Sequence, residues 1–167
     1  MTFHIRPTDA ADWRAVRDLR LEMLRDTPIA FGETIATAES LGEAEWRMRG
    51  ARGTDGHGTA VAAIDDDSGR WLGTMGGYLD KGMPLLVGVY VTPEFRGRDA
   101  GVASALLETI ETWAREHGDT LMLHVHEENV RARAFYASRG FAETGKTHPY
   151  VLDRSSRELE LVKSVAG

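Results

Sequence analysis

One stretch decides the reading of this chain: Val91-Thr92-Pro93-Glu94-Phe95-Arg96-Gly97-Arg98-Asp99-Ala100-Gly101-Val102-Ala103. An apolar run, 85–91, leads into it, and a helical pattern follows, with Leu106, Leu107, Ile110 and Trp113 on one face. A strand that enters a glycine-containing loop and then a helix presents backbone N–H groups and a helix dipole to phosphate. The stretch therefore predicts a phosphate-binding loop between a buried strand and an amphipathic helix.

A second segment lies thirty residues further on and reads Asn129-Val130-Arg131-Ala132-Arg133-Ala134-Phe135-Tyr136, closed by Gly140-Phe141. Asn129 is a favoured N-cap residue, so the segment predicts a helix that begins there. Tyr136 would lie on that helix, and a tyrosine on a neighbouring helix can donate a proton to a leaving thiolate. The two segments together predict a site for an acyl-CoA.

In this order and spacing the segments resemble the GNAT superfamily of acyl-CoA-dependent N-acyltransferases. That family carries Arg/Gln-x-x-Gly-x-Gly/Ala after its fourth strand and Asn-x-x-Ala-x-x-Phe/Leu-Tyr-x-x-x-Gly-Phe after its fifth. The resemblance covers roughly residues 85–141. The second motif matches at Asn129, Ala132, Phe135, Tyr136, Gly140 and Phe141.

The first motif can be aligned in two registers. Starting from Arg96, Asp99 falls where the family has glycine, and its carboxylate would repel a phosphate. Starting from Arg98, Gly101 and Ala103 both match, and the only cost is a loop two residues longer. We favour the Arg98 register, which leaves Arg96 as an auxiliary cation near a CoA phosphate or as a solvated arginine. By resemblance, the cofactor-binding loop comprises Arg96, Arg98, Asp99, Ala100, Gly101, Val102 and Ala103.

Composition limits the classes of protein to consider. A chain of 167 residues suits a single domain, residues 1–167, with a sizeable core. It has no cysteine, which excludes disulfides, thiolate metal sites and a cysteine nucleophile. The net charge of −6 argues against nucleic acid as a partner and favours cationic acceptors such as amines. With no apolar run of membrane-spanning length and no signal-peptide pattern, we expect a cytoplasmic protein without a membrane partner.

Periodicity and turn signals predict the order of the elements. The predicted fold is a mixed α/β sheet, mainly antiparallel, flanked by helices on both faces. The resemblance implies that the fourth and fifth strands splay apart and that the acyl-CoA pantetheine lies in the gap. We expect strands at 3–7, 59–64, 70–79, 85–91, 120–126, 141–146 and 158–165. We expect one helix from Thr8 or Asp9 to about Arg25 and a second that begins at Ser40, where Ser40 and Glu43 would form a capping box. Two further helices are expected at 101–117 and 129–139.

The resemblance also implies a reaction, the transfer of an acetyl group from acetyl-CoA to an amine by direct attack in a ternary complex. Backbone N–H groups near Tyr90 and Val91 would stabilise the oxyanion. Tyr136 would protonate the leaving thiolate, and Asn129 would also hold the pantetheine arm. Acetyl-CoA is the expected co-substrate, no metal is expected, and the chain could form a homodimer.

The general base is less well defined by the sequence, because several residues could take the proton of the amine. We assign Glu33 as a candidate catalytic residue, since it lies between the first two predicted helices, with Asp26 and Glu39 nearby to attract a cationic amine. A relay of water is an alternative to any single base. The other candidates are His126, Glu127, Tyr78 and Asp80.

Three questions about function stay open at this level. The acceptor, which we expect to be a small-molecule amine, could instead be a peptide or protein. A non-catalytic acyl-CoA-binding module is disfavoured by Tyr136, and a nucleotide-binding domain by the lack of any magnesium-site pattern. His124 and His126 share a strand face, but they lack a fixed third partner, so we predict no metal site.

Overall fold

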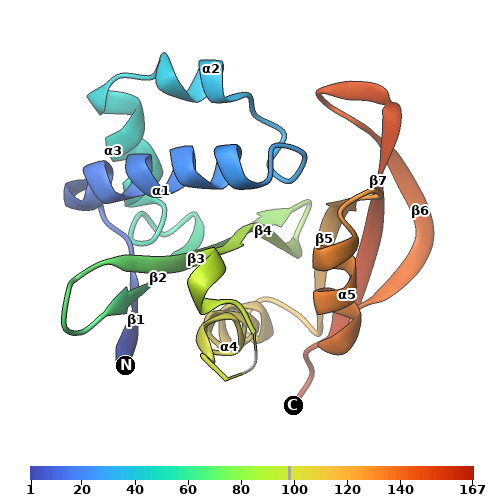
Figure 1. Cartoon of the computed structure of the whole chain (residues 1–167). Helices are drawn as coiled ribbons and strands as arrows, with labels where there is room; N and C mark the ends of the chain where they lie inside the picture. The colour runs from blue at the N-terminus through green and yellow to red at the C-terminus, as the bar shows by residue number, and fades with distance from the viewer. Residues whose placement is uncertain (98) are drawn as a thin grey trace.

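The computed structural model describes residues 1–97 and 99–167 and contains a seven-stranded sheet of order β1-β2-β3-β4-β5-β7-β6 (Figure 1). All neighbouring strands are antiparallel except β4 and β5, which run parallel. This arrangement confirms the predicted mixed, mainly antiparallel sheet. The strands are β1 (Phe3–Pro7), β2 (Gly58–Asp65), β3 (Trp71–Asp80), β4 (Met83–Val91), β5 (Thr120–His126), β6 (Ala142–Tyr150) and β7 (Asp153–Ser164).

Helices cover both faces of the sheet (Figure 1). The helices are α1 (Trp13–Asp26), α2 (Ile35–Glu39), α3 (Glu43–Ala51), α4 (Val102–Arg115) and α5 (Val130–Ser138), with 3-10 turns at Ala10–Asp12 and Pro93–Phe95. Helices α1 to α3 lie on one side of the sheet and α4 on the other. In the described part of the chain, none of these helices has the length and apolar character needed to cross a membrane.

The larger core lies between the sheet and α4. Val102, Leu106, Ile110 and Ala114 recur at helical spacing and are fully buried there. Burying each large apolar side chain stabilises the fold by roughly 1.5–3 kcal/mol. This packing fixes the beginning of α4 against the sheet, beside the ends of β4 and β5.

A smaller core lies on the opposite face. Leu19 and Met23 of α1 pack on Tyr90 of β4, while Trp13 and Trp46 fill the space among the first three helices. Tyr90 is therefore held between the sheet and α1. This packing fixes the positions of α1 and α3 relative to each other.

The structure corrects the prediction between residues 27 and 51. The short helix α2 was not predicted, and α3 begins after Gly42, whose backbone N–H donates to Oε2 of Glu45 at 3.1 Å. Ser40 does not cap α3; its hydroxyl donates to the carbonyl of Thr37 at 2.6 Å and helps to end α2. The capping pair thus lies two residues later than the one predicted from Ser40 and Glu43.

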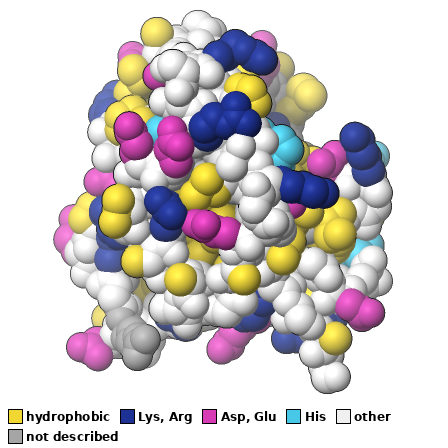
Figure 2. All heavy atoms as spheres, turned by 90° about the vertical axis from the view of Figure 1, so that its right-hand side faces the viewer, with side chains coloured by type: hydrophobic (Ala, Val, Ile, Leu, Met, Phe, Trp, Pro, Cys, Tyr) yellow, Lys and Arg dark blue, Asp and Glu magenta, His cyan; other side chains and the backbone are white. Residues whose placement is uncertain are grey.

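Figure 2 shows the side of the molecule on which α5, β6 and β7 lie. Among the side chains coloured there, basic and acidic groups are interspersed, and apolar groups are exposed between them. Proteins that bind nucleic acid backbones gather basic groups into a patch or stripe. This face does not show that pattern among the coloured side chains.

Candidate active site

The first element of the site is a gap between β4 and β5. Within the described chain, Leu85 opposite Met122 is the only residue pair that joins the two strands. Beyond it the strands diverge around a cavity of about 370 Å³. We call it the β4–β5 cavity; its lining includes Val89, Tyr90 and Val91 of β4, His124, Val125 and His126 of β5, and Asn129, Ala132, Phe135 and Tyr136 of α5.

The beginning of α4 lies at this cavity and has the features of an anion site. Gly101 is the N-cap residue, has φ +74° and has no side chain to cap the first turn, so among the described residues no side chain occupies the N–H groups of that turn. A Cβ built on Gly101 would meet nothing within 4 Å, which shows that the space in front of the turn is open. These features fit the pyrophosphate of a CoA.

The remaining loop residues divide between packing and exposure. Val102 is fully buried in the core, whereas Ala103 lines the β4–β5 cavity. Ala100 is half-buried and Asp99 is exposed. Arg98, which we predict as the first residue of the phosphate motif, lies outside the described residues.

Arg96 is not the solvated arginine that we considered, because its guanidinium is paired within the protein. Its Nε donates to the carbonyl of Val91 at 2.8 Å, and its Nη2 pairs with Asp26 at 2.5 Å. Arg131 of α5 approaches the same carboxylate at 3.7 Å. Arg96 lines the β4–β5 cavity, and it is a paired residue that ties the end of β4 to α1.

Asn129 and Tyr136 face the same cavity from α5. Oδ1 of Asn129 accepts the N–H of Ala132 at 3.3 Å, so Asn129 is the N-cap and its NH₂ group remains available to a ligand. Tyr136 is buried between the rings of Phe135 and Phe141, at centroid distances of 5.5 and 5.6 Å. Burial raises the pKa of Tyr136 well above its ordinary value. The phenol is therefore protonated at neutral pH, and because it is a weaker acid than a thiol it would act by donating a hydrogen bond.

A bulge interrupts β4 in the middle of the site. Thr74 of β3 faces Tyr90 and Gly76 faces Val87, so Met75 alone faces the two residues Gly88 and Val89. Gly88 has φ +61°, a left-handed conformation that side chains rarely adopt. We predicted oxyanion donors at Tyr90 and Val91. These two residues pair regularly with Thr74 and Gly73 of β3, and the bulge lies just before them in β4.

A second cavity, of about 550 Å³, opens on the side of α1 and α3. We call it the α1–α3 cavity. Its walls include Leu19, Met23, Trp46 and Trp71, and its polar lining includes Arg20, Arg49, Arg52, Asp55, His57 and Tyr78. It shares Met75, Val87 and Gly88 with the β4–β5 cavity, so the two cavities meet at the bulge.

The arginines of the α1–α3 cavity were not predicted as site residues. Arg49 and Arg52 are three residues apart, a spacing that places two side chains on one helix face. That spacing was the only sequence signal. The spacing of Arg49 and Arg52 does not indicate that this helix face lines a cavity together with Arg20 of α1.

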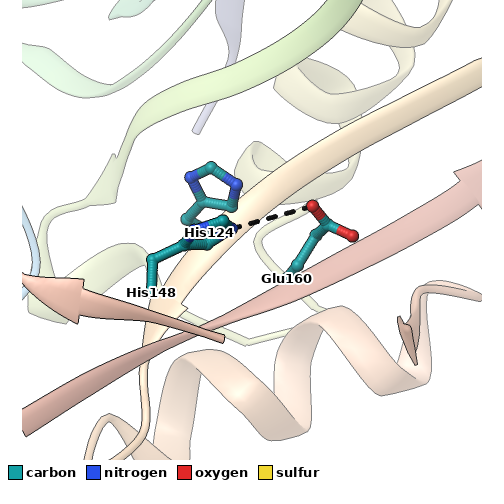
Figure 3. A group of neighbouring side chains, drawn as sticks. All are labelled: His124, His148 and Glu160. Atoms are coloured by element: carbon teal, nitrogen blue, oxygen red, sulfur yellow. Dashed lines mark ion pairs between the residues drawn. The ribbon is translucent and has the colours of Figure 1, made fainter. Parts of the chain in front are cut away.

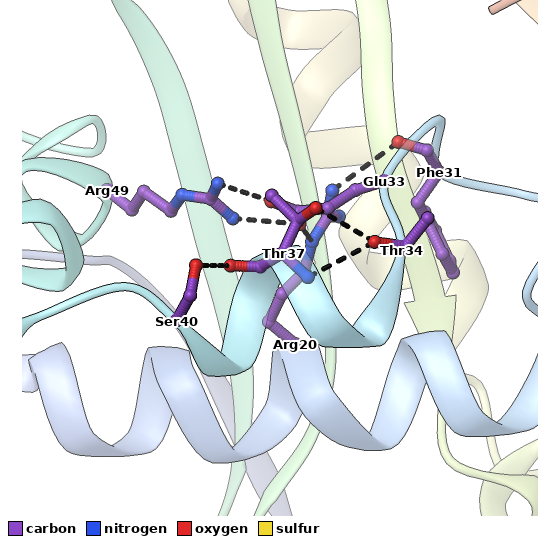
Figure 4. Close-up of polar contacts among 7 residues, drawn as sticks. All are labelled: Arg20, Phe31, Glu33, Thr34, Thr37, Ser40 and Arg49. Carbon is purple, nitrogen blue, oxygen red and sulfur yellow. Dashed lines mark hydrogen bonds and ion pairs between the residues drawn. The ribbon is translucent and has the colours of Figure 1, made fainter. Parts of the chain in front are cut away.

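Glu33 does not have the environment of a base (Figure 4). Its carboxylate accepts from Arg49 at 2.6 and 3.0 Å and from Arg20 at 2.9 Å. The hydrogen bonds from Arg49 and then Arg20 lower the pKa of Glu33 to about 2, against the cost of its burial. A carboxylate held this way is a poor proton acceptor, and Glu33 does not line either cavity. We correct its assignment from catalytic base to an anchor that joins the loop after α1 to α1 and α3.

The other candidate bases are also engaged or distant. Nδ1 of His126 accepts the N–H of Glu128 at 3.1 Å, so the neutral ring carries its proton on Nε2 and has no free acceptor. Oε1 of Glu127 accepts the N–H of Arg157 at 3.1 Å. Asp80 is exposed at the end of β3, and Tyr78 is an exposed wall residue of the α1–α3 cavity.

The loop after α1 also has a different place from the one predicted. We expected Glu33 of this loop, with Asp26 and Glu39 nearby, to meet the acceptor amine. Thr27, Ala30 and Phe31 instead line the β4–β5 cavity, where Phe31 packs edge-on against Tyr90 with centroids 6.5 Å apart.

One group of side chains has the composition of a metal site (Figure 3). His124, His148 and Glu160 come from the neighbouring strands β5, β6 and β7, and their potential ligand atoms lie within 4.8 Å of one another. Nε2 of His148 is 3.8 Å from Oε1 of Glu160, whose Oε2 accepts the hydroxyl of Thr144 at 2.7 Å. The ligand atoms would have to approach one another to reach zinc at about 2.0–2.2 Å. His126, which we considered beside His124 and rejected as a ligand, is not part of this group among the described residues and packs against Tyr150.

Known proteins share this fold and its sequence pattern. The chain matches the sequence profile of the Acetyltransferase (GNAT) family over residues 13–141. Curated protein sequences give no significant match. Fold and site define an acetyltransferase that uses an acyl-CoA. The chain belongs to the GNAT family of acetyltransferases and is an acyl-CoA-dependent N-acetyltransferase.

Solved structures resemble this one over nearly the whole chain. PaiA N-acetyltransferase from Thermoplasma acidophilum, in complex with coenzyme A, has a TM-score of 0.78 at 18% identity and covers 98% of this chain and 99% of its own. YncA from Salmonella typhimurium, with acetyl-CoA, has a TM-score of 0.77 at 16% identity, covering 100% and 96%. A phosphinothricin acetyltransferase from Sinorhizobium meliloti, in complex with AcCoA, has a TM-score of 0.76 at 21% identity, covering 98% and 89%. Acetyl-CoA is the co-substrate of this chain.

Proposed function

We propose that the enzyme moves the acetyl group of acetyl-CoA directly to the amine of a small molecule. One observation carries this proposal: the β4–β5 cavity and the α1–α3 cavity meet at Met75, Val87 and Gly88. A thioester bound from one side and an amine bound from the other would meet at this junction. Because the chain has no cysteine, the transfer does not pass through an acyl-cysteine.

Each group of residues around the junction would have a separate role in the reaction. The first turn of α4 after Gly101 would hold the pyrophosphate, and Asn129 would donate its free amide hydrogens to the pantetheine arm. The backbone N–H of Val91, which points away from β3 into the gap, would stabilise negative charge on the thioester oxygen, whereas the N–H of Tyr90 points toward β3. Tyr136 would donate a hydrogen bond to the sulfur as it leaves.

The proton of the amine would leave through water. The titratable side chains that line the α1–α3 cavity in the described structure are Arg20, Arg49, Arg52, Asp55, His57 and Tyr78. The arginines stay protonated, and Asp55, His57 and Tyr78 are exposed to solvent. A relay of water from the junction to solvent therefore fits the cavity better than a single base.

The size of the cavity favours a small acceptor. The solved relatives include both a phosphinothricin acetyltransferase and a ribosomal-protein-S18-alanine N-acetyltransferase, so relatives of this fold do not decide between small and protein acceptors. A volume of about 550 Å³ lies within the range of roughly 300–1,000 Å³ that is usual for small-molecule pockets.

A turnover screen tests this proposal. Purified enzyme is incubated with acetyl-CoA and, separately, with amino acids, polyamines, aminoglycosides and peptides, and the release of free CoA thiol is measured against a control without acceptor. We expect release with a small amine and detection of the acetylated amine by mass spectrometry. Acetylation of peptides alone would contradict the proposal, as would thiol release without any acetylated amine.

A further inference from the structure

The α1–α3 cavity is positively charged although the chain as a whole carries −6. Arg20, Arg49 and Arg52 line it, and Asp55 is the carboxylate that lines it among the described residues. This local charge opposes the cationic acceptors that net charge alone would favour, because a second cation entering the cavity would be repelled.

Glu33 neutralises only part of this charge (Figure 4). It binds Arg49 through both of its oxygens and Arg20 through one, so a single carboxylate serves two guanidinium groups. Both arginines are largely buried, with 21% and 22% of their side chains exposed. The group of three therefore keeps one net positive charge at the wall of the cavity.

Arg52 adds a further cation at the end of α3. In the chain as described, its guanidinium has no ion pair and no side-chain hydrogen bond; Asp55 is its nearest source of opposite charge. Arg52 is an exposed residue, and partial burial of its guanidinium, followed by repulsion from Arg49, lowers its pKa from the ordinary value. An arginine carries five N–H donors in a planar fork that matches a carboxylate. Arg52 thus offers donors that the protein itself does not use.

The position of these arginines in the cavity determines what they can bind. The junction with the β4–β5 cavity is formed by Met75, Val87 and Gly88 of the sheet, whereas Arg49 and Arg52 belong to α3 and its end. Apolar walls that include Trp46 and Trp71 complete the lining. A ligand that fits has an amine for the junction and an anionic group for the arginines.

We infer that the acceptor is a small amine that also carries a carboxylate, and that Arg52, supported by Arg49, binds this carboxylate. The inference rests on the proposed function and adds the substrate class. The arginines orient the molecule so that its amine reaches the thioester at the bulge of β4.

Paired acceptors test this inference. Steady-state kinetics compare amino acids with their carboxamides, which keep the amine and lose the negative charge, at saturating acetyl-CoA. We expect kcat/KM to be at least about 10-fold higher for the carboxylate, the size usual for hydrogen bonds to charged groups. Equal or better turnover of the carboxamides or of diamines would overturn the inference while leaving the proposed function intact.

A variant and its matched control locate the binding group. Arg52→Gln should raise KM for the carboxylate about 10-fold or more, leave KM for the carboxamide and for acetyl-CoA unchanged, and so abolish the preference. Arg47→Gln is the control, because Arg47 is an exposed residue of the same helix that pairs with Glu43 at 3.3 Å and does not line the cavity. If Arg52→Gln affected both acceptors equally, Arg52 would not bind the carboxylate.

A binding measurement covers the case in which none of these compounds is acetylated. Calorimetric titration of amino acids into the enzyme with bound CoA should show binding that Arg52→Gln weakens and Arg47→Gln does not. The absence of binding by the wild-type enzyme would overturn the inference. Absence of acetylation together with binding would count against the proposed function alone.

Discussion

At the scale of single residues, Tyr136 offers the most direct test of the chemistry. It is buried against Phe135 and Phe141 and lines the β4–β5 cavity, where its hydroxyl would donate a hydrogen bond to the leaving sulfur under the proposed function. We expect Tyr136→Phe to lower kcat about 10-fold or more with little change in CoA affinity. Tyr150→Phe is the control, a second buried tyrosine that does not line the cavity. Wild-type turnover by Tyr136→Phe, measured with a good acceptor, would rule out the assigned role.

Glu33 is the residue on which the packing of the loop after α1 depends. Its pKa is lowered from 4.5 to about 2, so folding favours the carboxylate; this stability is fully present above about pH 4.5 and is lost as the pH falls toward 2. At pH 7 we expect Glu33→Gln to reduce the free energy of unfolding by roughly 2–3 kcal/mol, since two partly buried arginines lose their partner.

Urea unfolding of the wild type and of this variant between pH 2 and pH 7 checks the Glu33 prediction. The difference between the two free energies of unfolding should become smaller as the pH falls. Glu39→Gln, at an exposed position of α2, should change stability by less than about 0.5 kcal/mol. If the wild type and Glu33→Gln were equally stable at pH 7, the ion pairs of Glu33 with Arg20 and Arg49 would contribute nothing to the free energy of unfolding.

Single residues also show how far the sequence alone could predict the site. Asn129 and Tyr136 were predictable because their spacing within one helix fixes their relation to each other. Arg20, Arg49 and Arg52 were not, because their meeting depends on how α1 and α3 pack. Glu33 was assigned to the right loop but to the wrong role, since nothing local to residue 33 indicates the two arginines that bind it.

At the scale of elements, the beginning of α4 combines a backbone requirement with a binding role. Valine at Gly101 would be strained at φ +74° and would place methyl groups in front of the N–H groups of the first turn. We expect Gly101→Val to raise the Kd for CoA more than 10-fold, a loss of over about 1.4 kcal/mol. Gly69→Val is the matched control: φ is +73° in the turn after β2, with open space around it, and it lines neither cavity.

Calorimetric titration with CoA separates strain from binding. Both glycine variants should lose similar stability, and only Gly101→Val should lose affinity. Equal affinities for CoA in the two variants would mean that α4 does not hold the pyrophosphate.

Elements with clear periodicity were predicted well, and those defined by tertiary pairing were not. The apolar stripe of α4 and the continuous apolar run of β2 are both visible in the sequence. Strand β6 was predicted at 141–146 but extends to Tyr150, and β7, predicted from residue 158, begins at Asp153. The added part of β6 is exposed and contains Pro149, so its pairing with β7 rather than its composition makes it a strand. Around α2, two overlapping capping patterns compete, and only the burial of Trp46 selects Gly42 and Glu45.

At the scale of the whole molecule, the β4–β5 cavity makes stability depend on the co-substrate. A ligand that binds only the folded chain raises stability by about 2.7 kcal/mol at a concentration 100 times its Kd. We expect acetyl-CoA and CoA to raise the melting temperature by several degrees in a thermal shift assay, and ATP at the same concentration to have little effect. Stabilisation by ATP alone would contradict the assignment of the cavity to CoA.

The single residue pair between β4 and β5 has a further consequence for how the molecule assembles. Strands β1 to β4 and helices α1 to α3 come from one continuous stretch, residues 3–91, and strands β5 to β7 from another, residues 120–164. Each stretch makes its own antiparallel ladders, mostly between neighbours in the chain, so each can form its part of the sheet early. The cavity exists only after the two parts have joined at Leu85 and Met122. We therefore expect the binding site to form only when residues 120–164 have joined the sheet built by residues 3–91.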